Sequence, residues 1–407
     1  MVKPAYNDPY HHGATLLTPS LVHCIAVCAA RQVGGEGMGR EQRVIRRRRQ
    51  SPLHGLRVAV HPLDALLLAA PLAFVAAQLH WGAALLFFAS GLAIIPLARL
   101  IGVATEELAG RLGTAAGGLL NATFGNATEL IIAVIALRAG RPDLVKASLI
   151  GSVLGNVLAV VGLAFLVGGW RRERQRFDAT AAGAAGAQLT LAASALLVPT
   201  ILVATSRVHA GDLETLSVAT ALVLLLGYGA GLLFSLRTHA HLYTEEDEEA
   251  LHGPGWGVRN AVVVLLLATV GVAVLSEWLV RGVTGVTAGL GWSEVFVGVI
   301  LVALIGNAAE HASAVAVAAR DRMDLSLSIA LGSAAQIALF VAPALVLLGL
   351  ALGHPLTLLF DPFEVAAVVI AAVLANQVIR DGESTWLEGA QLLAVYVLLA
   401  IAFFIHA

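Results

Sequence analysis

Charged residues are scarce in this sequence: Asp, Glu, Lys and Arg make up 13% of its 407 residues. Soluble globular domains carry about 25%. Hydrophobic residues make up 58% of the chain, and the mean hydropathy is +0.84. A soluble globular protein is therefore excluded, and lipid is the expected solvent. The formal net charge is −2, and no nucleic-acid partner is expected.

Cysteine is also scarce, since Cys24 and Cys28 are the only two and both precede the hydrophobic part of the chain. Two cysteines cannot form the disulfide framework of a small secreted protein. Their CxxxC spacing has no second pair, so it is weak evidence for zinc and indicates two free thiols. No cysteine lies at membrane depth, where a thiolate site for Zn²⁺ or Cu⁺ would need one.

Long apolar segments dominate what remains. A bilayer core about 30 Å thick needs about 20 apolar residues in a helix. Small residues within these segments allow helices to pack closely in lipid. Eleven segments are predicted to span the membrane: 63–80, 83–103, 115–138, 144–168, 183–206, 213–236, 258–281, 291–319, 324–349, 362–379 and 385–406.

Residues 1–58 differ from the rest and are expected to be a disordered cytoplasmic tail. Their apolar stretch at 21–30 is too short to span a membrane and precedes Arg46–Arg49, which is the wrong order for a signal peptide. One hypothesis is that translation begins at Met38 and that residues 1–37 are an upstream extension; N-terminal sequencing of native protein would test it.

Positive charge predicts the orientation. Arg46–Arg49 precede the first span, so the N-terminus is expected in the cytoplasm of a cell whose inner or plasma membrane holds the protein. The loops then alternate, and one of them, with Arg138, Arg141 and Lys146, lies outside against the rule. The loops that follow the rule contain Arg171, Arg172, Arg174, Arg176, Arg320, Arg322 and Arg380.

An internal repeat organises the spans. Residues 125–152 match residues 306–333 at an offset of 181, with 11 identities in 28 aligned positions, and the matches include the polar residues. The first transmembrane helix, within 59–82, stands apart. A first repeat, 83–236, and a second, 258–407, each hold five spans and are joined by the acidic cytoplasmic loop 237–257. An odd number of spans makes the repeats inverted, an architecture that places a transport site near the midplane.

Glu129 and Glu310 lie at equivalent positions of the repeat, inside apolar spans. A charge at the bilayer centre costs at least about 2.5–3.5 kcal/mol. Asn126 and Asn307 lie three residues earlier, on the same helix face. The glycine before each asparagine is expected to break the helix locally and free backbone carbonyls. Oxygen ligands of this kind suit Ca²⁺.

The same pair of acids, desolvated and without a metal ion, would hold protons instead. Binding of either Ca²⁺ or protons, but not both, is the physical basis of antiport. Other polar residues are candidate ligands from the next helix of each repeat: Ser152, Asn156, Ser333 and Gln336. The alternative is that these side chains only form hydrogen bonds that pack the bundle.

A proton path is a further hypothesis. His311 follows Glu310 and could relay protons or simply pack. Glu106 and Glu277 are placed at the ends of the second and seventh spans, where they could line a path to the site or be solvated at the interface.

These segments resemble a known family. GNATELIIAVIAL with SLIGSVLGN, and GNAAEHASAVAVA with ALGSAAQIALFVAP, resemble the two α-repeats of the calcium/proton exchangers in the cation/Ca²⁺ antiporter superfamily. The resemblance runs from about residue 60 to the C-terminus. It implies an all-α, polytopic membrane protein with eleven transmembrane helices as 1+5+5, and Ca²⁺ binding by the two glutamates with the neighbouring Asn, Ser and Gln side chains.

The coupling ion and the reaction class have alternatives. Sodium-coupled relatives carry a proline shortly before each acid, whereas Ala127-Thr128 and Ala308-Ala309 stand here, which favours protons. The alternative is a Na⁺- or K⁺-coupled Ca²⁺ or Mn²⁺ exchanger. An intramembrane hydrolase using Glu310 and His311 is a weaker hypothesis, because no HExxH is present. No enzyme activity and no cofactor are expected beyond transported Ca²⁺ and protons, and the sequence permits an oligomer.

Overall fold

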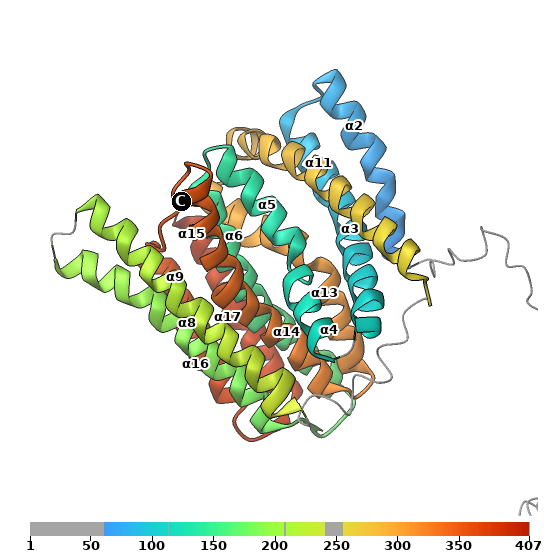
Figure 1. Ribbon diagram of the computed structural model, residues 1–407, viewed down its shortest axis with the longest axis vertical. Coiled ribbons are helices and arrows are strands. Elements are labelled where there is room, and N and C mark those ends of the chain that lie inside the picture. Colours follow the sequence, from blue (N-terminus) through green and yellow to red (C-terminus); the bar gives the residue numbers. More distant parts are fainter. Residues whose placement is uncertain (1–60, 113, 207–208, 241–254, 407) are drawn as a thin grey trace, which may run out of the picture. The chain divides into compact units, whose positions relative to one another are not determined.

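The computed structural model describes residues 61–112, 114–206, 209–240 and 255–406. The predicted tail, the Met38 hypothesis and most of the acidic loop lie outside these residues. Nearly all of the described chain is helical (Figure 1). Among the described residues, nine helices are long and apolar enough to cross a membrane, and Pro362–Val378 (α16) is a shorter apolar helix. With the broken span α4–α5, these account for the eleven predicted segments and confirm the fold class.

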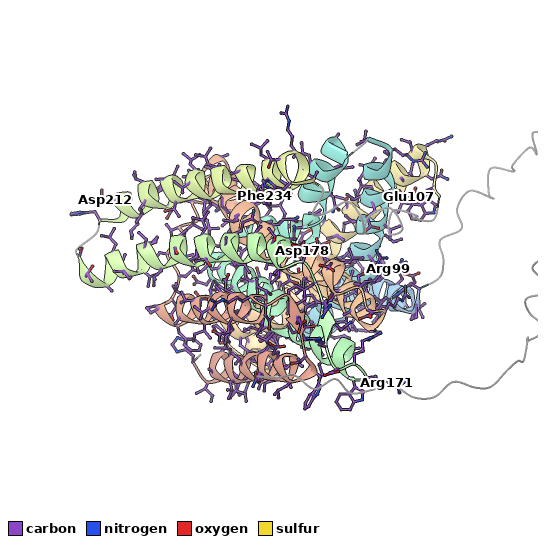
Figure 2. The ribbon with its side chains drawn as sticks, turned by 90° about the horizontal axis from the view of Figure 1, so that it is seen from below. Arg99, Glu107, Arg171, Asp178, Asp212 and Phe234 are labelled. Atoms are coloured by element: carbon purple, nitrogen blue, oxygen red, sulfur yellow. The ribbon has the colours of Figure 1, made fainter. Side chains whose placement is uncertain are left out.

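The first half of the chain contains the opening helix and five spans. Their bounds are η1 Pro62–Leu68 with α2 Ala69–Leu79, α3 Ala83–Leu112, α4 Thr114–Phe124, α5 Ala127–Arg138, α6 Pro142–Leu154 continuing through η2 Gly155–Val160 into α7 Val161–Gly169, α8 Ala179–Thr205, and α9 Ala210–Leu233 ending in η3 Phe234–Thr238. Asp212 and Phe234 lie at opposite ends of α9 (Figure 2).

The second half repeats this order. Its bounds are α11 Val258–Leu290, α12 Glu294–Phe296 continuing through η5 Val297–Val302 into α13 Ala303–Ala319, α14 Met323–Gln336 continuing through η6 Ile337–Val341 into α15 Ala342–Ala351, α16, and α17 Trp386–Ile405. The π-helical turns η2 and η6 occupy nearly equivalent positions of the repeat. Such turns are frequent at functional sites.

The Gly-Asn pair breaks only one of the two equivalent helices. In the first repeat α4 ends at Phe124, and Asn126 has the non-helical angles φ −99° and ψ 26° before α5 begins. In the second repeat α13 runs without interruption through Gly306 and Asn307. The expectation of a break in both repeats is therefore wrong for the second one, where η5 lies before the motif instead.

The long helices α3 and α11 pack side by side in antiparallel directions (Figure 1). Glycine permits this: a Cβ at Gly282 would lie 2.7 Å from the backbone nitrogen of Phe87. At the far end of α3, Glu107 accepts a hydrogen bond of 2.6 Å from the backbone nitrogen of Gly255. Arg111 donates to the carbonyl oxygen of Trp256, which is completely buried. The segment that follows the acidic loop is thereby fixed to α3.

Loops predicted to share one side of the membrane do meet. Gln175–Arg176 (β1) pairs with Glu383–Ser384 (β2) in a short antiparallel ladder. Arg172 Nη2 donates to the carbonyl oxygen of Ala319 at 3.3 Å. These contacts join three loops that were all predicted to be cytoplasmic. The alternation of loops is consistent with this arrangement.

Candidate functional site

Glu129 and Glu310 come from different repeats and approach each other inside the bundle. Glu129 lies in the first turn of α5, directly after the break, and Glu310 lies within α13. A Cβ added at Gly306, one turn before Glu310, would lie 3.2 Å from Oε1 of Glu129. The Glu129 carboxyl group therefore lies against the turn of α13 that precedes Glu310. A side chain at Gly306 would crowd this carboxyl group, which would have to shift by a few tenths of an ångström.

Serine and asparagine side chains connect the repeats around the carboxyl groups. Asn307 on α13 donates from Nδ2 to Ser152 Oγ on α6 at 2.9 Å. Asn156 on η2 donates from Nδ2 to Ser333 Oγ on α14 at 3.1 Å and approaches Asn307 Oδ1 at 3.4 Å. The four side chains are almost completely buried. Each repeat therefore positions its polar groups with a serine of the other.

Asn126 and Gln336 form a further link between the repeats. Asn126 Nδ2 donates to Gln336 Oε1 at 2.5 Å, and Asn126 Oδ1 accepts from Ser333 Oγ at 3.3 Å. Ser333 also lies within hydrogen-bonding reach of the Glu310 carboxylate. Because its hydroxyl has one hydrogen, Ser333 can donate to only one of these acceptors at a time. The eight predicted ligand residues thus form one connected cluster.

Three acceptor oxygens of this cluster have no hydrogen-bond partner among the described residues: Oε2 of Glu129, Oε2 of Glu310 and Oδ1 of Asn156. A buried polar group left without a partner costs about 1–3 kcal/mol. Carboxylate and amide oxygens of this kind bind hard cations, and protons neutralise carboxylates. Beside Glu129, a cavity of about 10 Å³ has room for a single water-sized particle.

The donor set distinguishes between metals. No group of three or more His, Cys, Asp or Glu side chains lies together in the described part of the chain. The cluster instead combines two carboxylates with neutral amide and hydroxyl oxygens. Such oxygens suit Ca²⁺, which takes six to eight of them, whereas zinc sites use Cys and His.

The predicted proton-path residues are distributed differently. His311 Cε1 would lie 3.7 Å from a Cβ at Gly155, and its Nε2 is buried without a hydrogen-bond partner. Glu106 is exposed, and α3 continues past it to Leu112. Glu277 is exposed and paired with Arg281, and α11 continues past it to Leu290. Both helices extend beyond the predicted spans, so neither glutamate lies at a helix end, and a role for Glu106 and Glu277 in a proton path stays a prediction.

Sequence reasoning missed Ser148 and the π-helical turns. Ser148 lines the cavity beside Glu129 together with Ser152. The two serines are one helical turn apart, and this spacing is a signal that was available in the sequence. The π-helical turn η2 places Asn156 in the cluster, but its extra residue per turn has no simple sequence pattern.

Comparisons with known proteins agree with this geometry. Residues 82–237 and 260–405 match the family described as sodium/calcium exchanger protein. A Ca²⁺/H⁺ antiporter of Synechocystis is 48% identical over 84% of this chain and 96% of its own length. The Ca²⁺/H⁺ antiporter ChaA of Bacillus subtilis is 44% identical over 82% of this chain and 96% of its own.

Solved structures share the fold. The structure of native YfkE superposes with a TM-score of 0.73 at 40% identity and covers 84% of this chain and 99% of its own. The H⁺/Ca²⁺ exchanger CAX superposes with a TM-score of 0.60 at 16% identity over 84% of this chain and 91% of its own, which supports the fold alone. This multi-pass membrane protein, with its two repeats and paired carboxylates, belongs to the sodium/calcium exchanger family.

Proposed function

We propose that this protein is a Ca²⁺/H⁺ antiporter whose two glutamates, Glu129 and Glu310, bind either Ca²⁺ or protons. The observation that carries the proposal is the pair of partnerless carboxylate oxygens, supplied by equivalent positions of the two repeats. Asn126, Asn307, Ser152, Ser333, Asn156 and Gln336 complete the ligand shell, directly or through water. The antiporter names of the Synechocystis and Bacillus subtilis relatives support this function.

Charge neutrality explains the coupling. Two carboxylates carry two negative charges, which one Ca²⁺ or two protons would cancel. The empty, doubly charged site is expensive to bury in a low-dielectric environment, so it does not reorient freely. Only a loaded site changes sides, and a leak of either ion is suppressed. The protein is accordingly a transporter rather than an enzyme, with calcium ions and protons as its cargo and no resident cofactor.

The two repeats are the units that alternate access. Residues 83–236 and 258–407 form them, residues 237–257 link them, and the first transmembrane helix flanks them. The difference between the broken α4–α5 and the continuous α13 supports this reading, because equivalent sequences adopt different shapes in one state. The N-terminus faces the cytoplasm in this proposal. An inward proton motive force drives Ca²⁺ out of the cell, because each exchange couples Ca²⁺ efflux to proton entry.

Proton coupling is favoured over sodium coupling. Ala127-Thr128 and Ala308-Ala309 precede the acids, and Thr128 is buried without adding a charged ligand. The relatives with more than 40% identity named above are antiporters of Ca²⁺ and H⁺ by name.

Ion-swap transport in proteoliposomes tests the proposal. Vesicles with an acidic interior should take up ⁴⁵Ca²⁺ until a protonophore collapses the pH gradient. Glu129→Gln and Glu310→Gln should each abolish uptake, because one charge cannot neutralise Ca²⁺. Glu214→Gln is the matched control: Glu214 is exposed on α9 and is neither a predicted ligand nor a proton-path candidate, so its loss should leave uptake within about two-fold.

Two outcomes would reject the proposal. Uptake that survives both glutamine substitutions would show that the carboxyl pair does not bind the transported ion. Uptake driven by a sodium gradient at clamped pH, and insensitive to the protonophore, would select the sodium-coupled alternative.

A further inference from the structure

A large pocket opens where α7 and α13 end, and its lining residues are not part of the carboxylate cluster. Its volume is about 660 Å³. In Figure 2, Arg171 lies at the margin of the bundle, on the side away from Asp212. The lining residues are Leu166, Val167, Trp170, Arg171, Arg172 and Ala319. The antiport mechanism uses none of them.

The pocket has an apolar wall and an aromatic edge. Leu166 and Val167 precede the end of α7, and Val167 is 42% exposed. Trp170 is 69% exposed, and its ring meets that of Trp386, the first residue of α17, edge-on at 6.4 Å. Exposed tryptophans at the ends of membrane helices lie at headgroup level. The wall of the pocket therefore lies at acyl-chain depth, and its rim lies at the level of lipid phosphates.

Two arginines lie on the rim of the pocket, and they differ in their contacts with the rest of the protein. Arg172 donates to the carbonyl oxygen of Gly168 at 2.7 Å and pairs with Asp321 at 3.4 Å, so it is held in place. Arg171 is exposed, and no ion pair within the described part of the chain involves it. A negative charge entering here would meet the Arg171 guanidinium, which forms no ion pair with a carboxylate of the described residues.

We propose that this pocket binds an anionic phospholipid, with the phosphate at Arg171 and an acyl chain along Leu166 and Val167. The apolar wall favours a ligand with a hydrocarbon tail over a free anion. The arginines exclude a metal cation and favour an anionic over a zwitterionic headgroup. Basic pockets between transmembrane helices are known to suit such headgroups.

Native mass spectrometry of the detergent-solubilised full chain tests the proposal. The protein is titrated separately with phosphatidylglycerol and phosphatidylcholine, and the lipid-bound fraction is measured. Phosphatidylglycerol should be retained preferentially. Arg171→Gln should weaken its retention about five-fold, the loss expected for one arginine near a lipid surface. Trp170→Leu should weaken retention of both lipids, because it removes part of the aromatic edge.

Arg138→Gln is the matched control, since Arg138 is also an exposed arginine at a helix C-terminus but lies on α5. It should retain phosphatidylglycerol as the unsubstituted protein does. Equal retention of phosphatidylcholine, equal losses in both arginine variants, or displacement by millimolar inorganic phosphate would each overturn the proposal. Because the readout is lipid binding, it stands or fails independently of Ca²⁺ transport.

Discussion

Gly151 and Gly332 are equivalent by the internal repeat, yet the structure predicts opposite effects for alanine at the two positions. A Cβ at Gly151 would overlap the backbone of Val299 on η5, at 2.6 Å from both its Cα and its carbonyl carbon. Backbone cannot move aside as a flexible side chain can, so α6 and η5 would have to separate. At Gly332, apart from the adjoining residues and backbone of its own helix, no atom of the described residues lies within 4 Å of the added Cβ.

The magnitudes follow from two opposing contributions. Overpacking costs about 1–3 kcal/mol, and a backbone collision belongs at the upper end, about 3 kcal/mol. Alanine gains about 1 kcal/mol over glycine within a helix. Gly151→Ala should therefore destabilise the protein by about 2 kcal/mol, whereas Gly332→Ala should stabilise it by about 1 kcal/mol.

Thermal unfolding in detergent, followed by tryptophan fluorescence, measures the difference directly. The midpoint of the Gly151→Ala variant should fall, and that of Gly332→Ala should stay level or rise. Equal shifts for the two variants would refute the reasoning, because the close packing of α6 on η5 would then not distinguish the repeats.

Two further predictions concern the linker end and the pH response. Trp256→Ala should lower the free energy of unfolding by about 3–5 kcal/mol, because Trp256 is completely buried; chemical unfolding measures this, with Trp386→Ala, whose ring is 47% exposed, as the control. The apparent KM for Ca²⁺ should rise as pH falls on the Ca²⁺ side, since protons then occupy the carboxylates more fully; initial rates of ⁴⁵Ca²⁺ uptake at several external pH values measure it. A KM independent of pH would contradict competition at one site.

Much of the fold was predictable because membrane spans have a strong apolar signal. The segment 258–281 was nonetheless too short, since α11 continues to Leu290. Glu277 and Arg281 interrupt the apolar run near its end, and the structure pairs these two side chains on an exposed helix face. Apolar runs locate the part of a helix in lipid but not its extension beyond it.

The two glutamates of the candidate cluster were predictable from the same apolar signal, whereas the contacts between the repeats were not. Glu129 and Glu310 are conspicuous because a charge in an apolar span is costly. The pairing of Asn307 with Ser152 across the repeats depends on packing between distant segments, which a single sequence does not encode in any local pattern. The different behaviour of the two Gly-Asn pairs also lay beyond prediction, since identical letters occupy both positions.

The different conformations of the two Gly-Asn segments have a consequence for the state in which the site opens to the other side of the membrane. If the two repeats exchange conformations when the site opens to the other side of the membrane, the helix through Gly306 should bend while the helix through Gly125 becomes continuous. Gly332 would then pack directly against the backbone of a neighbouring helix, as Gly151 does in the conformation described here. The methyl group of a Gly332→Ala variant would then fit the conformation described here but collide with backbone in the opposite one. Such a variant could be stable and yet unable to open its site to the other side of the membrane.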